Sequence, residues 1–458
     1  MLHSAPDLRA LESATDGDVL LPGSPEYDLL RRPAIALFED VRPQAIVRCS
    51  SPADVAETIA LARRDGRHVA VRSGGHCFAG RSSTTGMVID VSPMRSVSVS
   101  DGVATIGAGA RLGEVYDALE GKGLTIPAGC GPTVGIAGLT LGGGLGILGR
   151  KHGLTSDNLL GAEVVLSDGR VVECDDDNES DLFWGLRGAG GGSFGVVTTL
   201  RFRTVRPPDA TSFHLEWPGG DAAAVVAAWQ EWAPAAPDEL AASLFLEAAG
   251  ERERPPVVHV FGAMADTESR TRESLDELVA RAGADPVSAS LEHLPYRETK
   301  RYLAEHGPGD DRPGGHPYSK SEYFRRPLPA AAVTALLDHL SRDRVPGQAR
   351  ELDFNPWGGA YNRVPEDATA FAHRNELFLL KHAVVIDGDA SSDTREAARS
   401  WLGRSWESVH PWGSGGVYPN FPDLDLDDLS PAYHGRNHAR LLRVKARYDP
   451  EGFFRFER

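Results

Sequence analysis

The first part of the chain alternates short apolar runs with polar, glycine-rich turns. These runs have the length and the content of β-branched residues that are typical of buried strands. After the first run, Ser51 followed by Pro52 predicts the start of a helix that continues to about Asp65, because proline fits the first helical turn. The expected strands are 45–49, 69–72, 87–90 and 96–99.

The same alternation continues to the end of this region. Residues 112–122 predict a helix, and Gly123 suits its C-terminal end. Ser-Asp-Gly at 167–169 lies between two apolar runs, which is typical of a hairpin. The two hairpin strands and one later strand are expected at 162–166, 170–173 and 195–202.

The pattern changes at Arg-Pro-Pro, residues 206–208. Beyond it, alanine-rich helical stretches alternate with strands such as 257–261, which predicts a second α+β domain. The segment 306–317 predicts a loop. Residues 433–448 predict one amphipathic helix, with Asp-Pro-Glu at 449–451 as its end. A chain of 458 residues has room for roughly two or three such domains.

Composition and charge narrow the function classes. The formal net charge is −17, so a general nucleic-acid binder is not expected, because phosphate-backbone affinity needs a basic face. No apolar run is long enough to cross a bilayer, and no secretory signal is visible, which favours a cytoplasmic protein. No His, Cys, Asp or Glu cluster has metal-ligand spacing. The four cysteines are too few and too scattered for a disulfide framework: Cys49, Cys77, Cys130 and Cys174.

Candidate chemistry begins where the strand 69–72 ends. Ser-Gly-Gly at 73–75 predicts a tight turn that can point several backbone N–H groups at an anion such as a pyrophosphate. His76 follows directly, and its imidazole is able to bond to an electron-poor ring system. A phosphate cradle beside a nucleophile suggests a nucleotide cofactor, with covalent attachment as one option.

Two further glycine clusters lie in the same region, at 135–146 and 187–195. The cluster at 135–146 is not a P-loop, and it does not have the Rossmann fingerprint in its strand–turn–helix context. Taken alone, the first is compatible with close helix packing and the second with a flexible loop. Because three glycine clusters fall in one region, a shared cofactor site is the better interpretation.

These motifs resemble the FAD-binding domain of the vanillyl-alcohol oxidase superfamily, and more narrowly the berberine-bridge-enzyme-like FAD-linked oxidases. The similarity runs in order along most of the chain. The matching segments are 72–76, 132–135, 142–146, 150–154, 157–159, 181–188, 195–198, 418–423, 433–437 and 444–450.

The resemblance implies an α+β protein with a two-domain PCMH-type FAD-binding fold. Residues 1–205 would form the first part of the FAD domain, 206–410 a substrate domain of antiparallel sheet backed by helices, and 411–458 a segment that returns to the FAD domain. FAD would be bound covalently through His76 by an 8α-methyl bond. The cofactor-binding residues implied are Arg72, Ser73, Gly74, Gly75, His76, Cys77, Cys130, Thr133, Val134, Gly138, Gly142, Gly143, Gly146, Val197 and Asn420.

Cys130 departs from the family pattern. Many members carry a second flavin bond from a cysteine directly before Pro-Thr-Val-Gly, but Gly131 occupies that place here. A shift of one residue in an extended segment turns a side chain to the opposite face, although a bulge could restore its aim. A single link through His76 is therefore favoured. Val134 resembles the oxygen-reactive members, which favours an oxidase; a plain core valine is the alternative.

Three residues are candidates for the chemistry. Tyr418 is the first choice for a base, or otherwise a hydrogen-bond donor, since it lies two residues before Asn420. In 351–355, alternation places Asn355 on a polar strand face, which is either an active-site wall or a solvated surface. His382 lies within an apolar strand and is either a satisfied core residue or a substrate contact.

The reaction implied is a two-electron oxidation of a small organic substrate, with O2 reduced to H2O2. Tailoring of a secondary metabolite is the first expectation. A sugar or oligosaccharide oxidase of the same fold is one alternative, and a flavin-binding protein without turnover is another. The partners expected are a small-molecule substrate and O2; the sequence does not indicate an oligomeric state.

Overall fold

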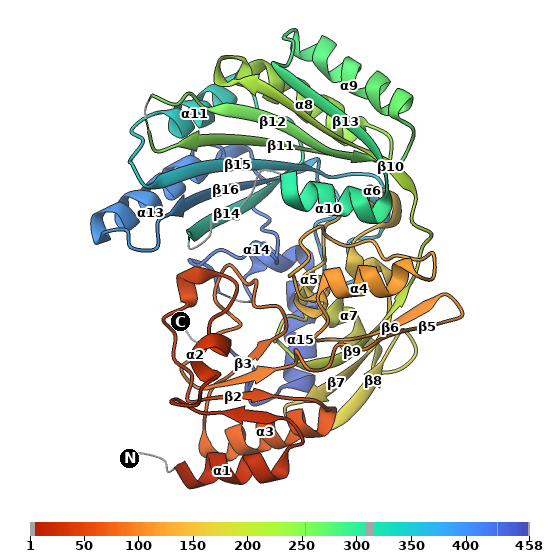
Figure 1. The fold of residues 1–458 in the computed structure, drawn as a ribbon, viewed down its shortest axis with the longest axis vertical. Helices are drawn as coiled ribbons and strands as arrows, with labels where there is room; N and C mark the ends of the chain where they lie inside the picture. Colours follow the sequence, from red (N-terminus) through yellow and green to blue (C-terminus); the bar gives the residue numbers. More distant parts are fainter. Residues whose placement is uncertain (1–4, 252, 307–314, 428, 457–458) are drawn as a thin grey trace.

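The structure, a computed structural model, describes residues 5–251, 253–306, 315–427 and 429–456. A seven-stranded sheet with its helices stands above two smaller sheets of four and five strands (Figure 1). We call the part built on the seven-stranded sheet the upper half. We call the part built on the two smaller sheets, together with the helices α14, Pro431–His434, and α15, His438–Tyr448, that pack beside them, the lower half.

The four-stranded sheet has the order β1-β2-β4-β3, and its last three strands are parallel. The predicted helix after β2 is confirmed as α3, Pro52–Asp65. The Ser51 side chain accepts a hydrogen bond from the Asp54 N–H at its start, and Gly66 ends it in the left-handed conformation. The strands are β1 Asp18–Leu20, β2 Ala45–Arg48, β3 Val69–Arg72 and β4 Met87–Asp90, and helices α1 Ala5–Ala14 and α2 Tyr27–Leu30 lie beside them.

The five-stranded sheet is antiparallel, in the order β5-β6-β9-β7-β8. The predicted hairpin is its β7–β8 pair, and Gly169 turns there with φ +84°. Its strands are β5 Val97–Ser100, β6 Val103–Gly107, β7 Leu159–Leu166, β8 Val171–Cys174 and β9 Gly195–Arg203. The helices of this region are α4 Leu112–Glu120, α5 Ile136–Leu141, α6 Gly149–His152 and α7 Ser180–Ala189.

The upper sheet is antiparallel, in the order β13-β10-β12-β11-β15-β16-β14. Four helices cover one of its faces, and that face carries the apolar side chains of alternate positions, such as Leu352 and Phe354. The strands are β10 Asp209–Pro218, β11 Leu240–Ala249, β12 Val257–Met264, β13 Ser288–Pro295, β14 His316–Phe324, β15 Gln348–Pro356 and β16 Phe378–Ile386. The covering helices are α8 Ala222–Ala235, α9 Glu268–Ala282, α11 Ala330–Ser341 and α13 Ser392–Glu407.

The other face of the upper sheet is turned toward the lower half (Figure 1). Helix α10, Tyr296–His306, lies on this side, and its Arg297 forms an ion pair with Asp117 of α4 at 2.7 Å. Short α12, Ala360–Arg363, packs on α6. Of the predicted loop 306–317, residues 307–314 lie outside the described residues.

The helix predicted over 433–448 is wrong as a single element. The chain forms α14, Pro431–His434, then one 3-10 turn over Gly435–Asn437, and then α15, His438–Tyr448. Gly435 has φ +47°, a left-handed conformation that an α-helix does not contain. Tyr433 and His434 lie directly before this break, and both line a cavity of the molecule.

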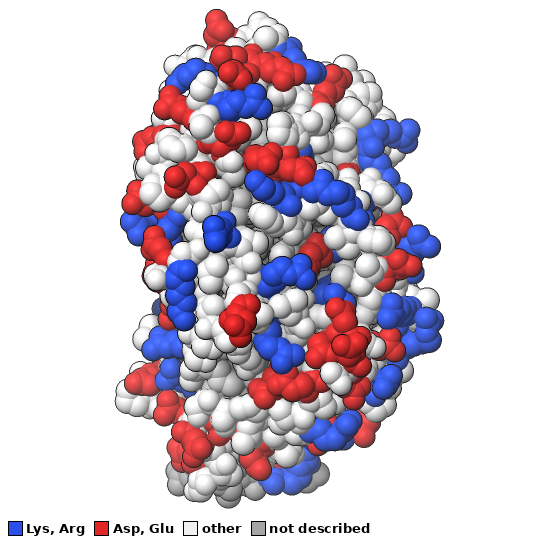
Figure 2. Space-filling model, turned by 90° about the vertical axis from the view of Figure 1, so that its right-hand side faces the viewer, with Lys and Arg blue, Asp and Glu red and all other residues white. Residues whose placement is uncertain are grey.

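The surface carries no single-sign patch on the face seen in Figure 2, where Lys and Arg are interspersed with Asp and Glu. Within the described residues, no helix has the length and apolar character needed to cross a membrane. The same residues hold no group of three or more His, Cys, Asp or Glu side chains placed to bind a metal ion.

Candidate active site

A cavity of about 820 Å³ opens beneath the upper sheet, lined from both halves of the molecule. Its volume falls in the range of ordinary ligand and cofactor pockets. All three glycine clusters singled out in the sequence reach it. The sequence-predicted residues in its wall are Ser73, Gly74, Gly75, His76, Cys77, Cys130, Thr133, Val134, Gly138, Gly142, Val197, Tyr418 and Asn420.

The turn after β3 is held by close backbone packing. A Cβ on Gly74 would lie 2.3 Å from the Gly135 nitrogen, so the first two glycine clusters touch main chain to main chain. Gly75 adopts φ +75°, and Ser73 donates its hydroxyl to the Ala108 carbonyl at 2.7 Å. Gly74 is therefore required by chain packing as well as by any ligand.

Arg72, which the resemblance implied as a cofactor residue, does not line the cavity. Its buried guanidinium donates to the carbonyls of Ser82 at 2.9 Å and Leu30 at 2.7 Å. The side chain of Arg72 points away from the cavity, and its hydrogen bond to the Ser82 carbonyl holds the later part of the β3–β4 connection in place. Arg72 thus shapes the turn and lies outside the site itself.

Some of the predicted glycines leave room for a ligand and others do not. A Cβ on Gly138 or Gly191 would meet no atom within 4 Å, so both present bare backbone to the cavity. Gly143 and Gly146 do not line it. A Cβ on Gly143 would press on Phe371 at 3.0 Å, and one on Gly146 would lie 2.2 Å from the Ala128 oxygen, so these two are required by packing.

His76 lies half-buried in the cavity wall. One ring nitrogen, Nε2, is 3.0 Å from the Thr133 hydroxyl of the second glycine-cluster segment. This contact joins the turn after β3 to the segment that carries Thr133. The wall on this side also carries Cys77 and Val134.

Cys130 lines the same cavity, and its surroundings are unusual. Burial raises the pKa of its thiol, and the neighbouring Lys300 ammonium opposes that rise. Lys300 comes from α10 and donates to the carbonyls of Ala128 at 2.5 Å and Gly129 at 3.0 Å. Sequence reasoning missed Lys300, because nothing in its local pattern marks it as buried.

Tyr418 and Asn420 lie together at the bottom of the cavity. The Tyr418 hydroxyl accepts hydrogen bonds from the Gly144 N–H and from Asn420 Nδ2, both at 3.1 Å. Asn420 Nδ2 also donates to the Leu139 carbonyl at 2.9 Å. Burial raises the pKa of Tyr418 to about 12, so its phenol is protonated at neutral pH, with two donors already directed at its oxygen.

His382 is placed away from the cavity. It is fully buried between β16 and α13, its Nδ1 lies 2.9 Å from the Ser405 hydroxyl, and burial lowers its pKa to about 3. The predicted catalytic contact is corrected here: His382 does not line the described cavity and is a core histidine whose Nδ1 is paired with Ser405, while its buried Nε2 has no hydrogen-bond partner in the described residues. Alternation along β16 assigns the cavity-facing side to its neighbour Lys381.

Lys381 is the polar residue of β16 that sequence reasoning missed. Its ammonium lies over the rings of Phe421 at 5.1 Å and Phe78 at 5.7 Å, and both rings line the cavity. Asp353 of β15 is 3.9 Å away. Asn355 shares this strand face and donates to Asp353 at 2.9 Å, but Asn355 is not part of the described cavity wall.

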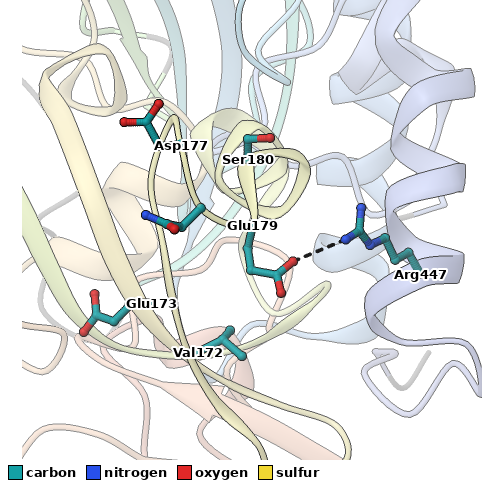
Figure 3. A pocket seen from close by; sticks show the side chains of 7 residues that line it. Val172, Glu173, Asp177, Glu179, Ser180 and Arg447 are labelled. Carbon is teal, nitrogen blue, oxygen red and sulfur yellow. Dashed lines mark hydrogen bonds and ion pairs between the residues drawn. The ribbon is translucent and has the colours of Figure 1, made fainter.

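A second hollow, of about 560 Å³, lies beside the β8–α7 connection (Figure 3). It is lined by the carboxylates of Glu173, Asp177 and Glu179, with Arg447 paired to Glu179 at 3.5 Å. A surface this rich in negative charge repels a diphosphate. The first cavity has no Asp or Glu among its described lining residues and is the one that suits an anionic cofactor.

Comparison with known proteins agrees with this geometry. The FAD binding domain family model matches residues 43–175, and the berberine and berberine-like model matches 417–458. Both matched segments contribute to the cavity wall. Together they define an FAD-binding protein with the C-terminal segment of the berberine-like enzymes.

Three curated relatives span nearly the whole chain. The uncharacterised FAD-linked oxidoreductase YgaK of Bacillus subtilis is 32% identical over 96% of this chain and 96% of its own length. A chitooligosaccharide oxidase of Gibberella zeae is 32% identical over 90% and 86%. The aclacinomycin-N/aclacinomycin-A oxidase of Streptomyces galilaeus is 30% identical over 90% and 84%.

Solved structures give the same result. The 6-hydroxy-D-nicotine oxidase of Arthrobacter nicotinovorans superimposes with a TM-score of 0.86 at 27% identity, covering 99% of this chain and 98% of its own. The glucooligosaccharide oxidase of Acremonium strictum, described as revealing a novel flavinylation, has a TM-score of 0.86 at 25% identity, covering 98% and 97%.

The chain therefore belongs to the berberine-bridge-enzyme-like FAD-linked oxidoreductases. This confirms the predicted α+β, PCMH-type fold, the FAD cofactor and the assignment as an oxidoreductase. The alternative of a flavin carrier without turnover is set aside by the oxidase and oxidoreductase relatives.

Proposed function

We propose that this protein is an oxidase that carries FAD through a single covalent bond to His76 and oxidises a small organic substrate. The observation that carries the proposal is that His76, Thr133, Tyr418 and Asn420 line one cavity, although the first and last are far apart in sequence. The division into 1–205, 206–410 and 411–458 remains part of the proposal, as does a cytoplasmic location.

The cavity suits FAD on two grounds. Gly138 and Gly191 expose backbone where a side chain would fill the space, and no carboxylate stands in the described wall. When bound, FAD accepts a hydride from the substrate carbon and passes two electrons to O2, which yields H2O2. Ser73, Gly74 and Gly75 would hold the cofactor through their backbone, and Val134 and Val197 would be apolar contacts in the same wall.

Tyr418 would handle the substrate proton. As a base it would act in its phenolate form, and the two N–H groups that already donate to its oxygen would stabilise that anion. Burial keeps the ground state protonated, which makes the hydroxyl a donor that orients the substrate before the reaction. Both tasks need the Asn420 amide to remain in its present position.

The substrate class has two candidates. Tailoring of a secondary metabolite is our first proposal, and the aclacinomycin oxidase relative supports it. A sugar or oligosaccharide oxidase is the second, supported by the chitooligosaccharide oxidase at slightly higher identity. Release of H2O2 from a panel of aromatic metabolites and of sugars separates them; no release from any member would contradict the oxidase assignment.

The covalent link is tested by acid denaturation followed by intact mass. We expect flavin to stay on the wild-type chain and on Cys130→Ser, and to be lost from His76→Ala. Flavin retained in both single variants would show two links and overturn the single-bond proposal. Flavin lost from the wild type would overturn covalent attachment altogether.

A further inference from the structure

Arg81 occupies a position in the cofactor cavity that none of the motifs discussed above includes. It lies on the same connection between β3 and β4 as His76. Two tight turns, from Gly80 N–H to the Cys77 carbonyl and from Ser83 N–H to the Gly80 carbonyl, carry the chain around it. A Cβ on Gly80 would lie 2.5 Å from the Phe38 ring, so this stretch of backbone is closely packed in place.

The guanidinium of Arg81 is held by aromatic rings from the C-terminal segment. It lies 5.5 Å from the centroid of the Tyr433 ring and 5.1 Å from that of Phe456, and all three residues line the cavity. The Tyr433 hydroxyl also accepts a side-chain hydrogen bond from Arg81; burial raises the pKa of that phenol, and this bond opposes the rise. The two rings and this hydrogen bond together hold the guanidinium at the cavity wall.

The charge of the cavity makes this residue distinctive. Among its described lining residues, Arg81 is the one Lys or Arg, and no Asp or Glu is present. In a cavity that is partly shielded from water, a positive charge attracts an anion more strongly than it would in bulk water. FAD brings one strongly anionic part, its diphosphate, and guanidinium groups match phosphate geometry bidentately.

We propose that Arg81 binds the diphosphate of FAD, opposite the backbone N–H groups of the turn at 73–75. The loop that carries His76 then supplies both parts of a phosphate site, neutral donors at one end and a cation at the other. The contact forms before any covalent bond and holds the cofactor while attachment at His76 takes place. This step rests on FAD as the cofactor and does not depend on the substrate.

The experiment measures non-covalent binding in a His76→Ala chain, freed of flavin by dialysis, with titration calorimetry against FAD, ADP and riboflavin. We expect Arg81→Met to weaken FAD and ADP about tenfold or more, and to leave riboflavin within about twofold, because riboflavin lacks phosphate. Arg81→Lys should recover part of the loss. With added salt, the FAD affinity of the His76→Ala chain that retains Arg81 should fall more steeply than the FAD affinity of the chain that also carries Arg81→Met.

Arg63→Met is the matched control. Arg63 also lies over a ring of the C-terminal segment, 5.8 Å from Phe453, but it does not line the cavity, so its loss should leave all three affinities unchanged. Equal weakening of riboflavin and FAD by Arg81→Met would overturn the proposal in favour of a contact with the flavin ring or a purely structural role. Unchanged FAD and ADP affinity would overturn it outright.

A second measurement keeps the test independent of the His76→Ala chain. With His76 intact and FAD limiting, covalent flavin per chain is read from intact mass, and Arg81→Met should incorporate flavin more slowly than Arg63→Met. Equal rates would count against Arg81. Failure of the His76 link would instead appear as flavin that is washed out by acid from every variant, so the two failures are distinguishable.

Discussion

The lower and upper halves reach the same cavity by different structural means. The lower half presents bare backbone, with Gly138 and Gly191 open to the space and the turn at 73–75 packed against Gly135. The upper half adds a few residues to the described wall, among them Leu303 and Ala304 of α10 and Pro317 of β14, and Lys381 of β16 lies over the wall rings of Phe78 and Phe421. We therefore expect cofactor binding to depend on loop geometry, and substrate contact to depend on which strand face a side chain occupies.

This difference explains which substitutions each half tolerates. In the lower half, a Cβ added at Gly74 would lie 2.3 Å from backbone, so even alanine displaces the chain. In the upper half, a side chain on the cavity face can change while the ladder stays intact, because the strand hydrogen bonds are made by the main chain. We expect substrate range to vary through the upper half and cofactor chemistry to stay with the lower half.

The largest expected effect lies where the halves meet, at Tyr418. Replacing it with Phe removes the hydroxyl and should lower kcat/KM by about 100-fold or more, as for loss of a general acid–base group. Because burial raises its pKa to about 12, the phenolate fraction grows with pH, and log kcat/KM of the wild type should rise with slope near one from pH 7 to 10.

Steady-state kinetics across that pH range provide the measurement. The Phe variant should give a flat profile while keeping its flavin content. A rising profile in both proteins would show that another group carries the proton, and Tyr418 would then serve only to position the substrate.

The neighbours Lys381 and His382 test directly which face of β16 is turned toward the cavity. Lys381→Met should raise KM about tenfold with little change in Tm, since its ammonium stacks on Phe78 and Phe421 in the cavity wall. His382→Leu should leave kinetics unchanged and lower the free energy of unfolding by about 1–3 kcal/mol, because it strands the Ser405 hydroxyl in the core.

Kinetics and urea unfolding on the two variants decide the matter. If His382→Leu changed KM while Lys381→Met did not, the sheet faces would be assigned the wrong way round. The pair is closely matched, since the two residues are adjacent on one strand and both are at most 5% exposed.

Sequence reasoning succeeded in the lower half because its signals are local. Ser51 and Gly66 cap one helix, and the turn at 73–75 with His76 is contiguous. It also identified the strands β15 and β16 in the upper half. It left the role of His382 open between core and substrate contact, because an apolar strand that is covered on both sides gives no pattern that distinguishes its two faces.

Arg72 and Arg81 show the same limit within one loop. Both are single arginines followed by serine, yet Arg72 turns inward to the Leu30 and Ser82 carbonyls and Arg81 faces the cavity. The position of Arg81 is set by Tyr433 and Phe456, which are remote in sequence and reach it only after the C-terminal segment returns to the lower half. Long-range placement of this kind leaves no local signal.

The last expected effect is on stability alone and concerns Lys300, which joins the halves from α10. Burial lowers its pKa from 10.5 to about 8, and it donates to Tyr116, Ala128 and Gly129. Between pH 8 and 10.5 the unfolded chain holds a proton that the folded chain lacks, so this lysine makes the free energy of unfolding rise with pH. Below pH 8 both states are protonated and it adds no slope.

Lys300→Met removes that titration while keeping the length of the side chain. The difference in unfolding free energy, wild type minus Lys300→Met, should therefore increase between pH 8 and 10.5, by at most about 1.4 kcal/mol per pH unit, and stay level from pH 6 to 7.5. Urea unfolding at each pH gives this difference, in which titrations common to both proteins cancel. If the difference in unfolding free energy did not change with pH over the whole range, the pKa of Lys300 in the folded protein would be its ordinary value. Burial of the ammonium between the two halves would then carry no cost in stability.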